Sequence, residues 1–587
     1  MNFTKEIKKI FYLLDSNHKY QLLIVFFIFF INIFFDLLGI GMIVPIVNVI
    51  IGNELGILSR FIPVELNFSN ISQEKLLFYA ILFFLIFYIV KTLFSTFAIW
   101  YQKRFIFKTS KEFQEKLLKK YFNIKYLDFL SRNQSDLIRN IVFESSIFIT
   151  SIVHSLIDLC IEILLLVGIG SLLILYDPAS ASILIFVIVV LGSSYVFFLR
   201  KKLKLLGLER QELTSSILKV LNESFILQKE VRILQKEEFI FKKFNENANK
   251  IANINIFEQI INSIPKIWFE FIAVLGLSGI VFYFILYNIS IELLIPLLAL
   301  YAAAIFRLLP CANRIIGSSN NIIHNLPAFK VIFDELIFSK KTSEKNLINK
   351  KNNTKLNQYI FKNFDKKKLK LNNLSFSYNK EKNNVVFQNI NLTFNKGQIT
   401  GLIGKSGSGK STIANIISGL IEDYDGKIEI NDNSDFNINV LRRSVGYVPQ
   451  ITNLLDDSIK NNICFGILNE DINHEKLNTI IKEVELNELI ENLDKGINTI
   501  VGDQGLTLSG GQRQKIALAR TLYLDPKIII FDESTNSLDK VTEKHFFKNI
   551  IALKKNKIII CITHDLGLSE YFDQIYNLSI IKDNEKK

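Results

Sequence analysis

The chain has 587 residues, a net charge of +13, 49% hydrophobic residues and a mean hydropathy of +0.27. This length allows about two to four domains, and the high hydropathy argues against an entirely soluble protein. Its four cysteines, Cys160, Cys311, Cys464 and Cys561, are scattered without CxxC spacing, which argues against a disulfide scaffold or a zinc site.

Residues 1–20 form a basic, amphipathic segment that runs directly into a long apolar stretch. A cleavable signal peptide would instead have a short apolar core followed by a small-residue cleavage site. We therefore expect residues 1–20 to remain as a cytoplasmic elbow helix before the first membrane span.

Residues 21–340 contain six apolar stretches that are long enough to cross a bilayer, which takes roughly 20 residues each. The sequence thus predicts a transmembrane domain of six helices. The predicted spans are Gln21–Ile51, Leu76–Tyr101, Ile152–Tyr176, Ala181–Leu199, Ile264–Tyr287 and Ile291–Pro310.

The distribution of lysine and arginine between the spans predicts the orientation, because cytoplasmic loops carry the excess of these residues. The N-terminal segment, Gln102–Thr150 and Arg200–Ser263 are long or rich in basic residues. We place these segments in the cytoplasm together with both chain termini. The opposite loops, Gly52–Lys75, Asp177–Ser180 and Asn288–Ser290, are short or poor in bases.

Each long cytoplasmic loop has a break in its helical pattern, at Ile124–Asn133 and at Leu221–Val231. We expect a short transverse helix at each break, in contact with the C-terminal domain. In the first external loop, Gly56–Leu66 is apolar with isolated charges. This segment fits either a small interfacial helix or an ordinary loop that packs on the ends of the spans.

Three basic residues, Lys91, Lys266 and Arg307, lie in the second, fifth and sixth predicted spans. Each charged residue in a span costs about 2.5–3.5 kcal/mol on insertion scales, so such residues usually face a cavity or a partner. One interpretation is a cavity for an anionic head group such as a pyrophosphate, and the other is structural pairing, as between Lys266 and Glu270 four residues apart. The acidic counterparts are Asp36, Asp158, Glu162 and Glu270.

Residues 341–367 form a linker rich in lysine and asparagine. Residues 340–370 hold eleven lysines against only Glu344 and Asp365. No aromatic residues interleave with the lysines in a nucleic-acid-binding pattern, so we expect a solvated linker at an anionic membrane face and no nucleic-acid partner.

Residues 368–587 change to short β-rich runs that alternate with helical patterns, as in an α/β domain around a mainly parallel sheet. The apolar run Ile399–Ile403 leads into G-K-S-G-S-G-K-S-T, and a helix is predicted from Lys410 to Gly419. This strand–loop–helix context is typical of a P-loop, which binds the phosphates of ATP, with Lys410 at the β- and γ-phosphates and Ser411 on Mg²⁺. The loop comprises Gly404, Lys405, Ser406, Gly407, Ser408, Gly409, Lys410, Ser411 and Thr412.

Two further strands of this domain end in polar residues. Ile528–Glu533 is an apolar strand that ends in two acids, so we expect Asp532 to hold Mg²⁺ and Glu533 to act as general base on the attacking water. The apolar run Ile558–Ile562 leads to His564, which we expect to contact the γ-phosphate.

These residues, with Leu508–Gln512 reading L-S-G-G-Q, resemble the ABC transporter superfamily over essentially the whole chain. The resemblance is to type IV exporter half-transporters, and it implies a helical membrane bundle fused to a cytoplasmic α/β P-loop ATPase domain. It also gives Gln450 a place as metal and water contact, Tyr378 as the aromatic that stacks on adenine, and Asp539 in the D-loop. Departures are Lys405 where proline is frequent, S-T-N-S-L-D after Glu533, and Asp565 where arginine is common.

In this family the signature of one subunit completes the ATP site of the other. The resemblance therefore implies that Ser509, Gly510, Gly511 and Gln512 bind, in trans, the ATP at the P-loop of a second copy, with Ser509 and Gly511 directed at the γ-phosphate. Mg²⁺ is assigned to Ser411, Gln450 and Asp532. We expect a homodimer with two equivalent sites and twelve spans.

Two short stretches, Ala304–Ile315 and Asn133–Glu144, resemble the lipid-linked oligosaccharide flippase of bacterial N-glycosylation. This resemblance implies a polyprenyl-diphosphate-linked glycan as cargo in the bacterial inner membrane, with its pyrophosphate held by Lys91, Lys266 and Arg307. A multidrug or lipid A-type exporter is the alternative, and a membrane-bound regulatory ABC ATPase that transports nothing is another.

Overall fold

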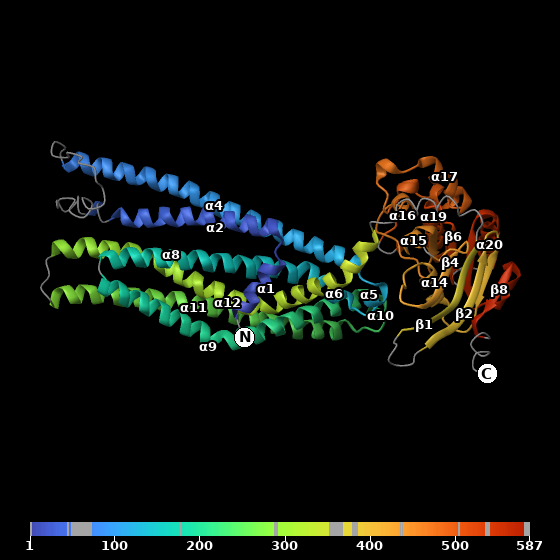
Figure 1. Cartoon of the computed structure of the whole chain (residues 1–587), viewed down its shortest axis with the longest axis horizontal. Helices are drawn as coiled ribbons and strands as arrows, with labels where there is room; N and C mark the ends of the chain where they lie inside the picture. The colour runs from blue at the N-terminus through green and yellow to red at the C-terminus, as the bar shows by residue number, and fades with distance from the viewer. Residues whose placement is uncertain are drawn as a thin grey trace. The chain divides into compact units, whose positions relative to one another are not determined.

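The computed structural model describes residues 3–43, 46–47, 73–176, 178–286, 291–350, 368–378, 385–434, 436, 438–502, 505–534 and 540–579. The chain divides into two compact units (Figure 1). Unit 1 comprises residues 1–124 and 131–343, and unit 2 comprises residues 125–130 and 344–587. The predicted external segment Gly56–Leu66 lies outside the described residues.

Unit 1 is a bundle of long helices. In the part of the chain that the structure describes, five helices are long and apolar enough to cross a membrane. The remaining predicted span, the fourth in chain order (Ala181–Leu199), lies within one continuous helix, α9. The main helices are α1 (Phe3–Leu13), α2 (Ser16–Gly41), α4 (Gln73–Asn123), α8 (His154–Tyr176), α9 (Pro178–Ile226), α11 (Glu237–Leu286) and α12 (Ile291–Lys350), with the short α6 (Gln134–Arg139), α7 (Ser145–Ile147) and α10 (Gln228–Ile233).

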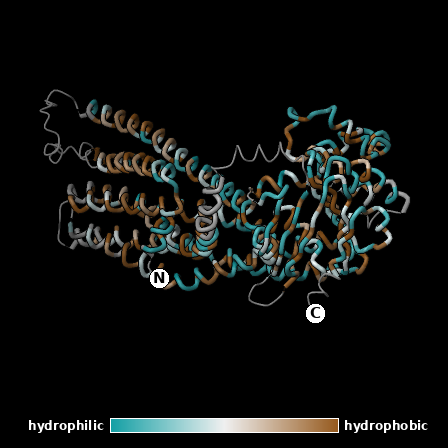
Figure 2. The backbone as a smooth tube through the Cα atoms, turned by 45° about the vertical axis from the view of Figure 1, so that its right-hand side comes forward, coloured by the Kyte–Doolittle hydropathy of each residue, from teal (hydrophilic) through white to brown (hydrophobic). Residues whose placement is uncertain are grey.

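Several of these helices extend well beyond the predicted spans. Helix α4 continues to Asn123, and α9 and α11 are of similar length. In Figure 2 the left-hand part of the long helices is mainly hydrophobic, and hydrophilic residues become more frequent toward their other ends. Helix α12 runs to Lys350, inside the segment predicted as a linker, and residues 351–367 lie outside the described part of the chain.

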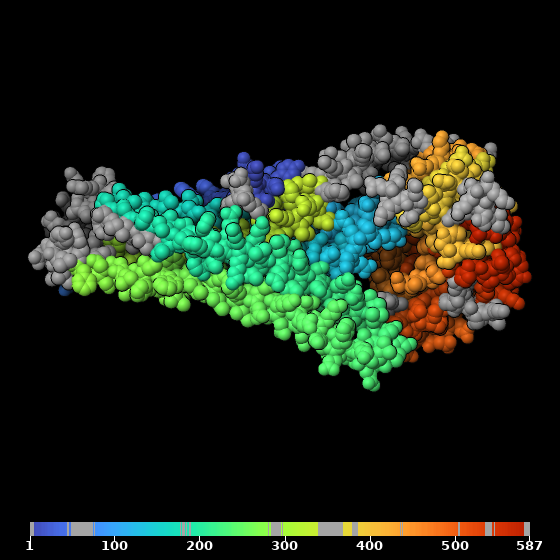
Figure 3. Space-filling model, turned by 90° about the horizontal axis from the view of Figure 1, so that it is seen from below, coloured from blue at the N-terminus to red at the C-terminus, as the bar shows by residue number. Residues whose placement is uncertain are grey.

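Packing between neighbouring long helices organises unit 1. Helices α9 and α11 run side by side along one face (Figure 3), and the Tyr195 hydroxyl of α9 donates to the Ile261 carbonyl of α11 at 2.7 Å. Helix α2 packs against both α4 and α8. Between α4 and α12, the rings of Phe113 and Phe329 both contact Phe148, at centroid distances of 5.5 and 5.6 Å. Phe148 begins a π-helical turn, Phe148–Val153, that follows another at Asn140–Glu144.

Helices α9 and α12 lie close together at Gly207. A Cβ added there would lie 1.9 Å from the carbonyl oxygen of His324, which is backbone and cannot rotate away. We expect Gly207→Ala to lower the free energy of unfolding by about 2 kcal/mol or more, because one helix must shift. The midpoint of thermal unfolding of the purified protein measures this effect.

Gly276→Ala is the matched control, since a Cβ at this position on α11 meets no atom within 4 Å. We expect it to be neutral or to stabilise helix α11 by up to about 1 kcal/mol. Equal unfolding midpoints for the two variants would contradict the close contact between α9 and α12.

A short helix is present at each of the two predicted breaks, although α9 continues to Ile226, inside the second one. The first is α5 (Tyr126–Leu130), and it belongs to unit 2. There, Lys125 donates to both carboxylate oxygens of Asp423 at 2.6 and 2.9 Å, and Leu127 packs against buried residues of the second unit. The second is α10, which follows the end of α9 in unit 1.

Unit 2 contains two sheets. An antiparallel sheet has the order β2-β1-β4, with strands β1 (Lys368–Ser377), β2 (Val385–Asn395) and β4 (Asp425–Ile430). A parallel sheet has the order β5-β6-β7-β3-β8, with β3 (Ile399–Ile403), β5 (Val445–Val448), β6 (Ile528–Asp532), β7 (Ile558–Thr563) and β8 (Gln574–Asn577). All five residues of β3 and of β6 are buried, as the continuous apolar runs predict for strands covered on both faces.

Helices cover the parallel sheet on both faces, so β3, β6 and β7 contribute to two hydrophobic cores. The carboxyl ends of these three strands lie at the same sheet edge, which is where the predicted phosphate-binding residues follow. The helices are α14 (Lys410–Ile417), α15 (Ile438–Ser444), α16 (Ile459–Ile463), α17 (His474–Glu483), α18 (Asn487–Glu491), α19 (Gly510–Tyr523) and α20 (Lys540–Leu553).

Candidate ATP site and intramembrane charge cluster

The P-loop connects β3 to α14, and its backbone turns at glycine residues. Gly407 and Gly409 have φ angles of +78° and +98°, in the left-handed region that favours glycine. A Cβ on Gly409 would also lie 2.9 Å from Val386 and 3.0 Å from Phe387. The loop therefore needs glycine there, and the tight turn lets backbone N–H groups face a phosphate at the start of α14.

Lys410 and Ser408 are buried inside this loop. The Lys410 ammonium donates to the carbonyl oxygens of Gly404 at 2.7 Å and Lys405 at 3.1 Å, so it is held at the centre of the loop. Among the described residues, the Ser408 hydroxyl has no hydrogen-bond partner although it is buried. A buried cation and an unsatisfied hydroxyl in a glycine loop fit the phosphates of ATP.

Asp532 ends β6 and is buried. Its carboxylate accepts a hydrogen bond of 2.6 Å from the Tyr447 hydroxyl of the neighbouring strand β5. Burial raises the pKa of Asp532, while hydrogen bonds from Tyr447 and Ser411 oppose this rise. The hydrogen bond places the Ser411 hydroxyl and the Asp532 carboxylate together, and such hard oxygens fit Mg²⁺, which would favour the charged carboxylate.

Glu533 follows directly and has a φ of 47°, which is uncommon for a residue other than glycine. Its backbone N–H donates to the Ile562 carbonyl of β7 at 2.9 Å, which fixes this turn. Its carboxylate accepts from Gln450 Nε2 at 2.8 Å and lies 3.3 Å from His564 Nδ1. The structure thus joins Gln450, Glu533 and His564, three residues far apart in the sequence.

Tyr378 follows β1, and just over half of its side chain is exposed. Its hydroxyl lies 3.0 Å from the Thr412 hydroxyl in the first turn of α14. Its ring contacts Phe376 edge-on at 4.9 Å, so the aromatic group is held beside the P-loop. A partly exposed ring at this place suits stacking on a base.

The signature residues form the start of another helix, α19. Ser509 is the N-cap residue: its hydroxyl accepts from the Gln512 N–H at 3.3 Å, and its own N–H donates to the Gln512 side chain at 2.8 Å. This capping box satisfies the N–H groups of Ser509 and Gln512 and fixes the start of α19. Asp539 lies outside the described residues, and the action of the signature in trans remains a prediction.

In unit 1, two of the three predicted cations share one carboxylate. Asp36 on α2 is buried, and it pairs with Lys91 of α4 at 2.8 Å and with the Arg307 guanidinium of α12. We call these three residues the Asp36 cluster. Lys266 instead pairs along α11 with Glu270 at 3.9 Å, and 70% of its side chain is exposed in the single chain.

The sequence identified all members of these groups except Tyr447, but it did not predict how they pair. The Asp36 cluster joins three helices, and nothing in local spacing indicates which acid meets which base. Tyr447 lies three residues before Gln450 in the sequence. Its contact with Asp532 becomes predictable only once β5 is known to lie beside β6.

Comparison with known proteins gives the family. The model of the ABC transporter transmembrane region matches residues 22–308, and the ABC transporter model matches residues 387–536. A putative export ATP-binding/permease protein of Rickettsia typhi is 37% identical over 221 residues. An ATP-dependent lipid A-core flippase of Pseudoalteromonas translucida is 38% identical over 224 residues. Each alignment covers 37% of this chain and 38% of the length of the relative, so the chain matches well under half of either protein.

The fold also matches a solved structure. A bacterial Atm1-family ABC exporter with ATP bound superposes with a TM-score of 0.74 at 19% sequence identity. The match covers 96% of this chain and 94% of that exporter chain. The region that matches the ABC transmembrane model is followed by the region that matches the ABC transporter model, and the fold is that of an exporter. The chain is therefore an ABC transporter with a transmembrane domain and a nucleotide-binding domain.

Proposed function

We propose that this chain hydrolyses ATP and uses the energy to move an anionic lipid across a bacterial inner membrane. The observation that carries the proposal is the convergence of Lys410, Asp532 and Glu533 at one edge of the parallel sheet, on a chain whose other unit is a membrane bundle. The ATPase domain then lies in the cytoplasm, where ATP is available.

The residues of the candidate site have different roles in ATP hydrolysis. The P-loop and Lys410 bind the phosphates, and Tyr378 stacks on the adenine. Ser411, Asp532 and Gln450 would hold Mg²⁺, which would neutralise charge on the phosphates. Glu533, oriented by Gln450 and His564, accepts a proton from the attacking water.

The functional unit of this proposal is a homodimer. Ser509 and Gly511 at the start of α19 contact the γ-phosphate on the P-loop of the second copy. Binding of ATP between the two copies favours one state of the membrane helices, and hydrolysis releases it.

The Asp36 cluster supports an anionic cargo. Its two cations outnumber its one carboxylate, so the cluster carries one net positive charge inside the membrane bundle. A charge that its partners leave uncompensated in a membrane usually marks a ligand or an ion pathway. A phosphate or diphosphate head group would neutralise it, and Arg presents several donors to such oxygens.

Two cargoes have this chemistry. The residues Ala304–Ile315 around Arg307 favour a polyprenyl-diphosphate-linked oligosaccharide, because of their resemblance to the oligosaccharide-lipid flippases. The names of two relatives, lipid A-core flippases, favour a lipid A-type cargo as second candidate. A regulatory ATPase without transport would show stimulated ATP hydrolysis but no lipid movement.

The cargo proposal is tested by Lys91→Gln and Arg307→Gln. Either change makes the cluster neutral while Asp36 keeps one partner, so we expect transport to fall about tenfold, as when one charged hydrogen bond is lost. Basal ATP hydrolysis should change little. The measurement is ATP-dependent movement of labelled polyprenyl-diphosphate oligosaccharide, and separately of lipid A, in proteoliposomes.

Lys266→Gln is the comparison variant, because it makes the same chemical change outside the cluster. Transport that falls equally in Lys266→Gln would extend the binding group to all three cations, as the sequence suggested. Equal loss of transport and of basal ATP hydrolysis in the Lys91 and Arg307 variants would show that the Asp36 cluster serves folding instead.

A further inference from the structure

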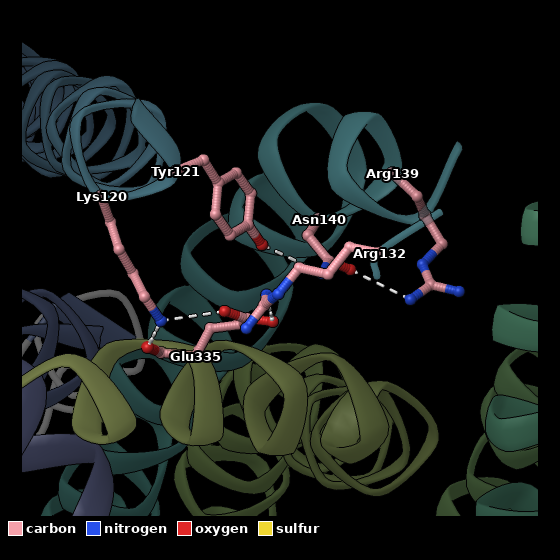
Figure 4. A network of polar contacts seen from close by, with 6 residues as sticks. All are labelled: Lys120, Tyr121, Arg132, Arg139, Asn140 and Glu335. Carbon is pink, nitrogen blue, oxygen red and sulfur yellow. Dashed lines mark hydrogen bonds and ion pairs between the residues drawn. The ribbon is translucent and has the colours of Figure 1, made fainter. Parts of the chain in front are cut away.

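Glu335 on α12 holds two cations that lie far away in the sequence (Figure 4). One carboxylate oxygen lies 2.9 Å from Lys120 Nζ, and the other lies 2.7 Å from Arg132 Nη1. Lys120 also donates to the backbone carbonyl of Glu335. Side-chain exposure is only 8% for Lys120 and 16% for Glu335, so this pairing is largely shielded from water.

The two cations flank the transverse helix α5. Lys120 lies near the C-terminus of α4, just before α5, and Arg132 follows α5 just before α6. Helix α5 itself belongs to unit 2, and the chain next leaves unit 1 after Ser343, within α12. The chain therefore crosses between the two units three times, after Ile124, after Leu130 and after Ser343. Lys120, Arg132 and Glu335 lie near these crossings, and all three belong to unit 1.

Further contacts stabilise the arrangement of α4 and α6 around Glu335. The Tyr121 hydroxyl accepts from Asn140 Nδ2 at 3.1 Å, and the Asn140 side chain accepts from Arg139 at 3.0 Å. The Arg132 guanidinium lies over the Tyr121 ring at 5.9 Å (Figure 4). Tyr121 and Asn140 are buried, so the ends of α4 and α6 are held in one arrangement around Glu335.

We propose that Glu335 is a positioning residue that couples α12 to α5 during transport, and this inference rests on the proposed function. Arg307 of the Asp36 cluster and Glu335 lie on the same continuous helix. A displacement of α12 that accompanies cargo binding carries Glu335 with it. The shared carboxylate then moves both flanks of α5 together, because separating a shielded carboxylate from two cations is costly.

The test is Glu335→Gln in the full-length protein reconstituted in liposomes. The amide cannot hold both cations as a carboxylate does, so the amount of lipid moved per ATP hydrolysed is expected to fall about fivefold or more. Glu335→Asp keeps the charge and should recover part of this ratio. Glu115→Gln is the matched control, since Glu115 forms an exposed pair with Lys111 on the same helix as Lys120.

A double-mutant cycle with Lys120→Met separates coupling from general damage. If Glu335 acts through Lys120, the two changes share one effect, so the double variant should lose little more than either single variant. Fully additive losses, or an unchanged ratio in Glu335→Gln, would overturn the proposal. If Glu335→Gln does not fold, Arg132→Gln tests the ion pair between Glu335 and Arg132 in the same way.

A second readout needs no cargo. A spin label is placed at the exposed position Lys330 on α12, in a Cys160→Ser background, and the distance between the labels of two copies is measured with and without ATP. The wild-type pairing should give an ATP-dependent distance change, and Glu335→Gln should reduce it. Wild-type protein that moves neither lipid would refute the proposed function, while an unaltered distance change in Glu335→Gln would refute the coupling role alone.

Discussion

Glu533→Gln is expected to reduce the rate of ATP hydrolysis at least about 100-fold, because it removes the general base. Binding of ATP should be preserved, since Lys410 and the P-loop are unchanged. Glutamine has nearly the shape of glutamate and remains within reach of Gln450 and His564, so the loop after β6 should keep its structure. Steady-state phosphate release and equilibrium binding of a labelled nucleotide measure the two effects.

Glu483→Gln at the exposed end of α17 is the matched control and should hydrolyse ATP at the wild-type rate. His564→Ala should also slow hydrolysis, since it removes one of the two side chains that orient Glu533. Turnover of Glu533→Gln near the wild-type rate would reject Glu533 as the base. A parallel loss of ATP binding would instead place Glu533 in nucleotide binding.

Ser509→Arg should abolish hydrolysis by blocking the signature surface, although its own P-loop is intact. The decisive experiment combines it with Lys410→Ala in mixed dimers. If each site uses the P-loop of one copy and the signature of the other, a mixed dimer has one site with both defects and one site with neither. Random pairing of the two inactive variants should then restore roughly a quarter of wild-type hydrolysis.

Ser458→Ala controls for loss of a helix cap, since Ser458 caps α16 as Ser509 caps α19. We expect it to cost about 1 kcal/mol of stability without abolishing hydrolysis. If mixing Ser509→Arg with Lys410→Ala restores no activity although mixed dimers form, Ser509 and Lys410 act within one chain, and the proposed shared site is wrong.

The sequence predicted the ATPase elements closely because their signals are local. The strand Ile399–Ile403 and the helix start at Lys410 coincide with β3 and α14, since a buried apolar run and a glycine loop leave few alternatives. The short helices α5 and α10 were also predictable, because a break in an amphipathic pattern is visible within about ten residues.

Contacts between distant segments were not predictable in the same way. Asp36, Lys91 and Arg307 were recognised as costly residues in spans, but their meeting depends on how α2, α4 and α12 pack. The ion pairs of Glu335 with Lys120 and Arg132 depend on the same packing, and no local sequence pattern indicates them. Helix α12 also continues past the predicted span, because its polar second half carries no apolar run that a span search detects.

The most direct measurement follows a fluorescent polyprenyl-diphosphate oligosaccharide between the leaflets of liposomes that contain the purified protein. ATP-driven flipping predicts that the label changes leaflet with wild-type protein and ATP, and does not with Glu533→Gln or without ATP. Labelled lipid A, measured in parallel, distinguishes the two candidate cargoes. Sustained ATP hydrolysis by wild-type protein with neither lipid moving would contradict lipid transport.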